Sequence, residues 1–355
     1  MRKLQSAALA TGTLIVAGIA ACAQTPPAAS APAWADPANW KSVQPVATSN
    51  IVYATVPLVH NPSAEASQAP GSVRPPMPTS GPAGTMDVHL DVYQVTSAAP
   101  TPVILQLHGG GWIIGDRPRS PSSFGPFFAA GASVVAIQYR NAIDAPAPAS
   151  VQDVRCAMAW VKTNAKKYNF DLDRVVLWGG SAGAHLALMA AYAPTSFNRP
   201  GCTDQPKVAA VLDDYGPTDL VDSLTFHGSV DITHQWLGMD LPLPPDPPPA
   251  GAPAGRPPTP HWPAPTPAML ARAKEVSPLT YIHPGLPPTF IVNGDHDGGV
   301  NPAESAALKK ALDEAHVPDG QYIVVGGGHG NFPPPEAQKA MMLSLQFLQA
   351  HGIIH

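Results

Sequence analysis

The positions of apolar residues along the chain predict strands and helices in alternation. Short runs rich in Val, Ile and Leu are typical of strands, and longer amphipathic segments are typical of helices. The expected strands are Ile51–Val56, Asp87–Tyr93, Val103–Leu107, Ser133–Gln138, Val175–Trp178, Val208–Leu212, Thr289–Val292 and Gln321–Val325. The expected helices are Ser123–Ala130, Val151–Lys167, Ala182–Tyr192, Pro302–Ala315 and Glu336–Ala350. This alternation predicts an α/β fold with a mostly parallel, eight-stranded sheet and helices on both faces. The first two strands precede every helix, so we expect them to form an antiparallel edge.

One segment, 241–267, departs from the alternation. It is rich in proline and has no apolar periodicity, which disfavours a regular helix or strand. It follows the sixth predicted strand. A loop of this length in a compact domain is either functional or disordered, so a cap over a pocket and a disordered excursion both remain open.

The composition narrows the class of protein. The chain has 355 residues, of which 45% are hydrophobic and 13% charged, and it contains 45 prolines. The formal net charge of −5 gives no indication of a nucleic-acid-binding surface. No group of residues has the spacing of a metal site, so we expect neither a metal nor an organic cofactor.

The N-terminus has the features of an export signal. Arg2 and Lys3 precede an apolar stretch from Leu9 to Ala21 that is too short for a good transmembrane helix. It ends in Ile19-Ala20-Ala21-Cys22, which resembles the bacterial lipobox. We therefore expect a signal peptide over 1–21, a lipid on Cys22, a flexible tether over 22–50 and a catalytic domain over 51–355. The protein would then be anchored in the bacterial cell envelope, and a soluble secreted or periplasmic protein is the alternative.

Two further cysteines, Cys156 and Cys202, lie in the body of the chain. Because exported proteins mature in an oxidising compartment, an even pair favours a disulfide. Two buried free thiols are the alternative.

A G-x-S-x-G sequence, Gly179 to Gly183, lies between an apolar strand and an Ala/Leu-rich helix. This context predicts a nucleophile elbow that exposes Ser181, with small residues on both sides of the turn. The Ala182 N–H, at the start of the helix, is directed at a developing oxyanion.

A second glycine run, His108-Gly109-Gly110-Gly111-Trp112, follows another apolar strand. We expect the N–H groups of Gly110 and Gly111 to complete the oxyanion hole, and Trp112 to form a wall of the pocket. His108 is expected to organise this loop, and His185, one turn beyond Ser181, to pack.

The base and its orienting acid are expected late in the chain. His329 lies among glycines just after the last predicted strand. Asp295 and Asp297 both follow the seventh strand, and we select Asp297, with Asp295 as an alternative that caps a helix or stabilises the loop. The order Ser181, Asp297, His329 is that of α/β-hydrolases.

The sequence resembles the α/β-hydrolase serine esterases with an HGGG motif. Within them it is most similar to bacterial carboxylesterases akin to hormone-sensitive lipase and to the feruloyl/acetylxylan esterase-like group. The motifs that carry the resemblance are Leu90–Tyr93, His108–Trp112, Tyr139-Arg140, Asp153–Arg155, Arg174–His185, Tyr215–Asp219, Ser277–Leu279, Gly294–Val300 and His329-Gly330. In this family the acid is the Asp three residues after the Gly of G-x-x-D-x-x-V, which implies Asp297. The chain departs from the family at Gly180, where Asp or Glu is common, and in the proline-rich insertion.

The resemblance and the motifs predict a serine carboxylesterase that hydrolyses small carboxylic esters through an acyl-enzyme. An amidase or formamidase of the same fold is one alternative, because fold and triad do not separate esters from amides. A non-catalytic envelope binding protein that kept the fold is the other. The expected partners are a small ester substrate and, through the lipid, a membrane.

Overall fold

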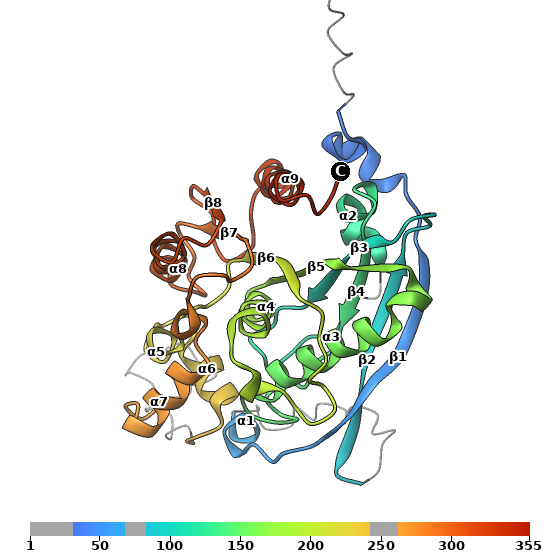
Figure 1. The fold of residues 1–355 in the computed structure, drawn as a ribbon. Coiled ribbons are helices and arrows are strands. Elements are labelled where there is room, and N and C mark those ends of the chain that lie inside the picture. Colours follow the sequence, from blue (N-terminus) through green and yellow to red (C-terminus); the bar gives the residue numbers. More distant parts are fainter. Residues whose placement is uncertain (1–30, 68–82, 119, 242–261) are drawn as a thin grey trace, which may run out of the picture. The chain divides into compact units, whose positions relative to one another are not determined.

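Eight strands form a single sheet in the computed structural model, which describes residues 31–67, 83–118, 120–241 and 262–355 (Figure 1). Across the sheet the strands follow the order β1-β2-β4-β3-β5-β6-β7-β8. Their bounds are β1 Val46–Pro57, β2 Thr85–Gln94, β3 Thr101–Leu107, β4 Ser133–Ile137, β5 Phe170–Gly180, β6 Val208–Asp214, β7 Thr289–Gly294 and β8 Asp319–Val324. All eight predicted strands are therefore present, with bounds that differ by a few residues.

The direction of the strands matches the prediction. β1 pairs antiparallel with β2, and β2 pairs antiparallel with β4, whereas every pairing from β4 across to β8 is parallel. The central strand β3 is buried over its whole length. Its side chains alternate between two cores, with Val103 and Leu105 in one and Ile104 in the other. A strand buried on both faces explains why the apolar run Val103–Leu105 does not alternate with polar residues.

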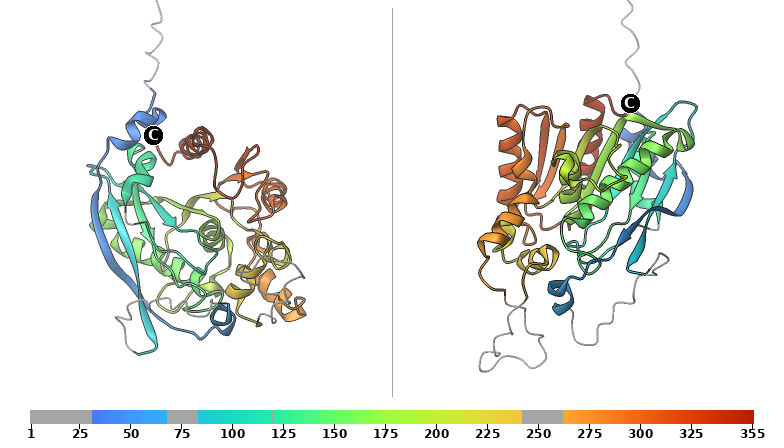
Figure 2. Two further views of the ribbon diagram at one scale, coloured as in Figure 1. Left: turned by 180° about the vertical axis from the view of Figure 1, so that it is seen from behind. Right: turned by 60° about the horizontal axis from the view of Figure 1, so that its bottom comes forward.

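Helices cover both faces of the sheet (Figures 1 and 2). α3, α4 and α8 pack on one face, and α2 and α9 pack on the other. The bounds of these five, which correspond to the predicted helices, are α2 Gly125–Ala129, α3 Ala149–Tyr168, α4 Ala182–Tyr192, α8 Pro302–Glu314 and α9 Pro334–Ala350. Four further helices of the described chain were not predicted from the sequence: α1 Pro62–Ala66, α5 Leu220–Ser223, α6 Val230–Leu237 and α7 Pro267–Glu275.

The predicted tether over 22–50 is wrong for its C-terminal part. Two 3-10 helices, Ala33–Ala35 and Pro37–Lys41, precede β1, which itself begins at Val46. Trp34 is 2% exposed and packs into the core that contains α2 and α9. Its indole N–H donates to the carbonyl of the last residue, His355, at 3.1 Å. Burial of one large aromatic side chain therefore ties this Pro- and Ala-rich stretch to the domain.

Several predictions concern segments outside the described residues. The signal peptide, Cys22 and the start of the tether all fall within 1–30, and most of the proline-rich insertion falls within 242–261. From residue 262 the described chain runs to α7 without regular structure. Within the described ranges, no helix has the length and hydropathy needed to cross a bilayer.

Candidate active site

Ser181 lies at the sharp turn between β5 and α4, in a backbone conformation rare for a residue with a side chain (φ 56°, ψ −125°). The turn depends on the glycines around it. A Cβ at position 179 would lie 2.4 Å from the carbonyl carbon of Gly183, and one at position 183 would lie 2.2 Å from the carbonyl oxygen of Leu107. The Ser181 N–H donates to the Asp214 carbonyl at 2.8 Å. The strained turn is thus fixed by close packing and by a bond to the neighbouring strand.

The structure brings Ser181 together with His329 and Asp297. His329 Nε2 lies 2.8 Å from Ser181 Oγ, and His329 Nδ1 lies 2.8 Å from Asp297 Oδ2. Because an ionised carboxylate only accepts, Nδ1 carries the proton and Nε2 accepts from the serine hydroxyl. The side chain of Asp297 is 2% exposed, whereas that of His329 is 32% exposed. The imidazole is therefore accessible while the carboxylate beneath it is shielded from water.

The two candidate acids have different partners. Asp297 Oδ1 accepts from the N–H groups of Gly299 and Val300, at 2.7 and 2.9 Å, which leaves Oδ2 for His329. Asp295 instead accepts from the Gly326 N–H at 2.6 Å and joins the ends of β7 and β8. Of the two carboxylates, the hydrogen bonds place Asp297 against the imidazole and Asp295 in the loop.

A cavity of about 600 Å³ opens above Ser181. The glycine run, Ala182 and His329 all line it, so the residues expected to build the oxyanion hole border the same space as the serine. Gly110 and Gly111 have positive φ angles of 117° and 59°, and a Cβ at position 110 would lie 2.1 Å from the Ile114 carbonyl oxygen. Only glycine fits this turn, which keeps backbone rather than side chains against the reacting centre.

Trp112 borders the cavity, but its ring is 1% exposed and belongs to a buried cluster. It stacks on Trp236 with ring centroids 4.6 Å apart. Its indole N–H donates to His185 Nδ1 at 3.2 Å, and His185 Nε2 donates to the Val276 carbonyl at 2.8 Å. Burial lowers the pKa of His185 to about 4, so the ring stays neutral. His185 therefore packs, as expected, and also links the glycine loop to α4.

His108 holds the start of the glycine loop, in agreement with its expected role. Its ring stacks on Tyr139 at 4.1 Å, and the Tyr139 hydroxyl donates to the His108 carbonyl at 2.6 Å. Burial lowers the pKa of His108, which keeps it out of acid–base chemistry near neutral pH. The loop is thus anchored at both ends by aromatic packing.

Other residues of the cavity were not identified from the sequence. Tyr215 follows β6 with a φ of 48°, and its ring meets the edge of His329 at 5.0 Å. Ile232, on α6, lies close enough to Gly111 that a Cβ there would meet its side chain at 3.0 Å. Gln106, Trp178 and Asp214 lie on the strands beneath Ser181. The sequence offered one signal for Tyr215. It lies in the Tyr215–Asp219 motif, which supported the family resemblance but was assigned no function.

The C-terminal end of α4 is also fixed. Cys156, on α3, forms a disulfide with Cys202, 46 positions later, after the short 3-10 helix Thr195–Phe197. The neighbouring Arg155 donates to the carbonyls of Met189, Ala190 and Ala193 at the end of α4. The Met189 carbonyl also accepts from the Ala193 N–H, whereas the last carbonyls of a helix have no partner within it, so a guanidinium is a suitable cap.

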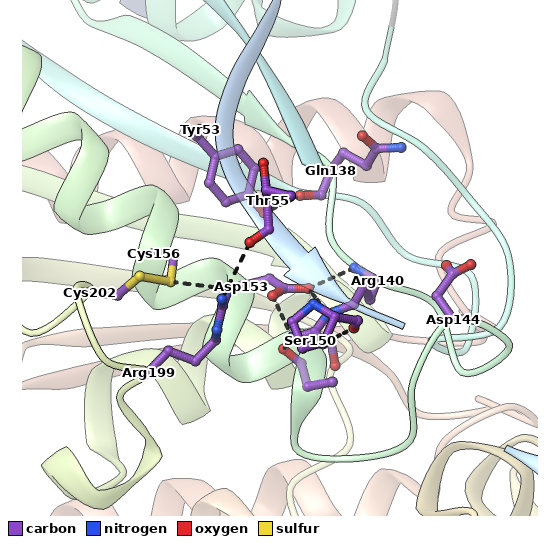
Figure 3. A network of polar contacts seen from close by, with 12 residues as sticks. Tyr53, Thr55, Gln138, Arg140, Asp144, Ser150, Asp153, Cys156, Arg199 and Cys202 are labelled. Atoms are coloured by element: carbon purple, nitrogen blue, oxygen red, sulfur yellow. Dashed lines mark hydrogen bonds and ion pairs between the residues drawn. A yellow bond between two sulfur atoms is a disulfide. The ribbon is translucent and has the colours of Figure 1, made fainter. Parts of the chain in front are cut away.

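Figure 3 shows how this region connects to β1. Arg199 lies beside the disulfide, with Nη1 4.0 Å from Cys156 Sγ, and its Nη2 donates to the Thr55 carbonyl at 3.4 Å. One turn earlier in α3, the buried Asp153 carboxylate accepts two hydrogen bonds from the Arg140 guanidinium, at 2.7 and 2.8 Å, and one from the Arg140 backbone N–H at 3.0 Å. Within the described part of the chain, no group of three His, Cys, Asp or Glu side chains has the arrangement of a metal site.

The chain is similar to known esterases in sequence and in structure. The family described as BD-FAE matches residues 90–246 and 262–312. Esterase LipQ of Mycobacterium tuberculosis is 28% identical over 281 residues, which span 78% of this chain and 61% of LipQ. The probable carboxylic ester hydrolase LipM of the same organism is 30% identical over 215 residues, 59% of this chain and 45% of LipM. The chain thus spans about half to three fifths of these relatives.

Two solved structures share the fold. A truncated carbohydrate esterase from gut microbiota has a TM-score of 0.61 at 21% identity and covers 88% of this chain and 98% of its own. Propionate-bound esterase 2 of Thermogutta terrifontis has a TM-score of 0.57 at 24% identity, with 76% and 91% covered. Together with the sheet order and the elbow, these similarities agree with the resemblance to HGGG esterases, and the chain belongs to the BD-FAE family of α/β-hydrolases.

Proposed function

We propose that the protein is a serine carboxylesterase that hydrolyses small carboxylic esters. The observation that carries the proposal is the continuous hydrogen-bonded line Ser181–His329–Asp297, with both bonds at 2.8 Å, on the wall of the cavity. A base in contact with a serine hydroxyl and oriented by a carboxylate is the arrangement that activates a serine nucleophile. A cavity volume of about 600 Å³ lies within the range of small-molecule sites.

The reaction follows from the positions of these groups. Ser181 Oγ attacks the ester carbonyl carbon while its proton passes to His329 Nε2, and Asp297 stabilises the imidazolium. The N–H groups of Gly110, Gly111 and Ala182 bind the oxyanion. The imidazolium then protonates the leaving alkoxide, which departs as an alcohol and leaves an acyl-serine. Water attacks this ester with His329 as base, and the carboxylic acid and the free serine are released.

The proposal is tested by ester hydrolysis and by covalent labelling of the serine. Wild-type protein should hydrolyse p-nitrophenyl esters of short acyl chains, and a fluorophosphonate probe should label Ser181. Ser181→Ala and His329→Ala should each lower turnover by roughly three orders of magnitude or more with the fold retained, because members of a triad act as a unit. Unlabelled Ser181 in folded wild-type protein would instead favour the non-catalytic binding protein. Faster hydrolysis of matched amides than of esters would favour the amidase.

We also propose that Cys22 is lipidated and anchors the protein in the cell envelope. The support is the sequence alone, in which the cysteine directly follows the apolar segment of an export signal. Cys22→Ser should move the protein from the membrane to the soluble fraction with its activity kept. An unmodified Cys22 in mass spectra of the mature N-terminus would overturn this proposal.

A further inference from the structure

Three side chains line the cavity on the face of the sheet that carries α2 and α9. They are Gln106 on β3, Trp178 on β5 and Asp214 on β6. Gln106 and Trp178 are register partners, and Asp214 is the register partner of Gly180. Because Ser181 directly follows Gly180 and bonds to the Asp214 carbonyl, this group lies next to the nucleophile. We call Gln106, Trp178 and Asp214 the polar floor.

The polar floor has unused capacity to accept hydrogen bonds. The Trp178 indole N–H donates to Asp214 Oδ2 at 2.8 Å, and Asp214 Oδ1 receives no hydrogen bond from the described residues. Gln106 is 8% exposed, and its Oε1 has no partner in the described part of the chain. Buried polar atoms are rarely left unpaired in native proteins, so an unpaired one beside a cavity calls for a donor from an ordered water, an ion or a ligand group.

The polar floor also has an uncompensated negative charge. Burial raises the pKa of Asp214 to about 6, although the Trp178 hydrogen bond acts in the opposite direction. The group is therefore mostly ionised at pH 7.5. Among the described residues that line the cavity there is no lysine or arginine. A partly desolvated carboxylate without a counter-charge attracts a cation and repels an anion.

The position of Tyr215 limits how the cavity floor is reached. A Cβ at Gly180 would lie 2.7 Å from the Tyr215 hydroxyl oxygen, and one at Gly330 would lie 2.6 Å from the Tyr215 ring. The ring therefore lies closely against both glycines, beside His329. The Tyr215 ring therefore fills the space over Gly180. Because Ser181, Asp214 and Tyr215 line the same cavity, a substrate group that extends from the reacting carbonyl toward Asp214 lies beside the Tyr215 ring.

We propose that the polar floor binds a protonated amine carried by the ester substrate. The inference rests on the proposed esterase function. An ammonium group has several N–H donors for Asp214 Oδ1 and Gln106 Oε1, and it neutralises the carboxylate. A hydroxyl group satisfies one acceptor and leaves the charge in place, and an alkyl group satisfies neither. The predominant effect is on selectivity between esters rather than on the chemistry at Ser181.

The test compares kcat/KM for methyl hexanoate and its ω-hydroxy, ω-amino and ω-carboxy analogues at pH 7.5 by pH-stat. The same four end groups on the alcohol side, as acetates of substituted butanols, show which half of the ester reaches the polar floor. Because a hydrogen bond to a charged group contributes about 1.5–3 kcal/mol, we expect the amino ester to be favoured over the unsubstituted ester by about 10- to 100-fold in one series. The carboxy ester should be the poorest substrate.

Asp214→Asn should abolish this preference and improve the carboxy ester relative to the unsubstituted ester, because the amide is neutral and its oxygen can still accept from Trp178. Asp213→Asn is the matched control. Asp213 is the adjacent buried carboxyl, it does not line the cavity, and its Oδ1 accepts from the Gly216 N–H at 2.9 Å, which an amide oxygen can also do. Its selectivity should equal that of wild type.

A measurement on wild-type protein makes the test independent of how the variants fold. The ratio of amino to unsubstituted ester hydrolysis should fall as the pH drops through about 6, where Asp214 gains a proton. The ratio cancels every effect of pH that is common to the two esters. Hydrolysis of all esters with equal or anion-favouring selectivity would overturn the inference alone. Hydrolysis of none would overturn the proposed function, and the inference with it.

Discussion

At the scale of single residues, two carboxylates that are two positions apart in sequence have different environments and different partners. Asp297 is shielded from water and has one oxygen on His329 and the other on two backbone N–H groups. Asp295 is exposed and its Oδ1 accepts from the Gly326 N–H. The same functional group therefore orients a base in one case and joins two strand ends in the other, because only one of them is directed at the imidazole.

Replacement of these two acids should reduce kcat to very different extents. Asp297→Asn keeps the size of the side chain but removes the charge that stabilises the imidazolium and favours the wrong tautomer, so kcat for a p-nitrophenyl ester should fall by roughly 10³- to 10⁴-fold. Asp295→Asn can still accept from Gly326 and should cost less than about tenfold. Circular dichroism of both variants should match wild type. A larger loss for Asp295→Asn than for Asp297→Asn would show that the acid is wrongly assigned.

Residues within a local motif were predictable, and residues brought together by strand register were not. Ser181, His329 and Asp297 each follow a strand and lie in a distinctive glycine context, so the sequence alone selected them, and the structure brings their side chains together. Gln106 and Asp214 are separated by more than a hundred positions and lie on strands two places apart in the sheet. Their proximity depends on which strands pair and in what register, and no local pattern encodes that.

At the scale of elements, α4 is held at both ends. Its first turn adjoins the Ser181 turn, and its last turn is capped by Arg155 beside the Cys156–Cys202 disulfide. His185, in its first half, bonds to Trp112 and Val276. The helix that begins at Ala182, beside the cavity, is therefore connected to α3, to the glycine loop and to the segment after α7.

His185→Phe should reveal the link between the glycine loop and α4. Phenylalanine keeps an aromatic ring against Trp236 but leaves the Trp112 N–H and the Val276 carbonyl buried without partners, at about 1–3 kcal/mol each. We expect a lower melting temperature and a lower kcat with KM little changed, because a displaced loop weakens oxyanion binding in the transition state. His283→Phe, at an exposed histidine, is the control. An unchanged kcat in folded His185→Phe would limit His185 to packing.

The disulfide should affect stability more than catalysis. A bridge between residues 46 positions apart restricts the unfolded chain by roughly 4 kcal/mol in the loop-entropy estimate, although native-state effects can reduce this. Reduction, or the double change Cys156→Ser and Cys202→Ser, should lower the melting temperature by several degrees and leave turnover at 25 °C within about twofold of wild type. Two free thiols in denatured, unreduced protein, with Cys22 blocked, would contradict the bridge.

At the scale of the whole molecule, the sheet and the helices α2, α3, α4, α8 and α9 followed from apolar periodicity, whereas α1, α5, α6 and α7 did not. These four helices have between four and nine residues, and a periodic pattern is hard to recognise over so few positions; α2, with five residues, is the one helix of comparable length that was predicted. They are stabilised by tertiary contacts instead. Glu304, on α8, accepts from the Thr218 and Asp219 N–H groups at 2.6 and 2.7 Å at the start of α5. A helix held in this way depends on a residue more than eighty positions away.

Buried carboxyls should give the whole protein a stability that declines as the pH rises. Burial raises the pKa of Asp213 from 3.8 to about 8, and that of Glu304 from 4.5 to about 7. A raised pKa means that the folded protein holds these protons more tightly than the unfolded chain, so the free energy of unfolding falls between about pH 4 and pH 8. His185, with its pKa lowered to about 4, acts in the opposite direction below pH 6.5. Because two carboxyls with a raised pKa outweigh one histidine with a lowered pKa, the free energy of unfolding should still fall as the pH rises from about 4.5 to about 8.

Asp213→Asn isolates the largest of these contributions. Asp213 Oδ2 has no hydrogen-bond partner among the described residues, so ionisation leaves a buried charge uncompensated. The amide carries no charge at any pH, and the melting temperature of the variant should rise relative to wild type by several degrees between pH 5 and pH 8.5. Asp173→Asn, at an exposed carboxyl, should show no such trend. Differential scanning fluorimetry across this range measures both, and a constant difference between Asp213→Asn and wild type would mean that Asp213 does not keep its proton in the folded protein.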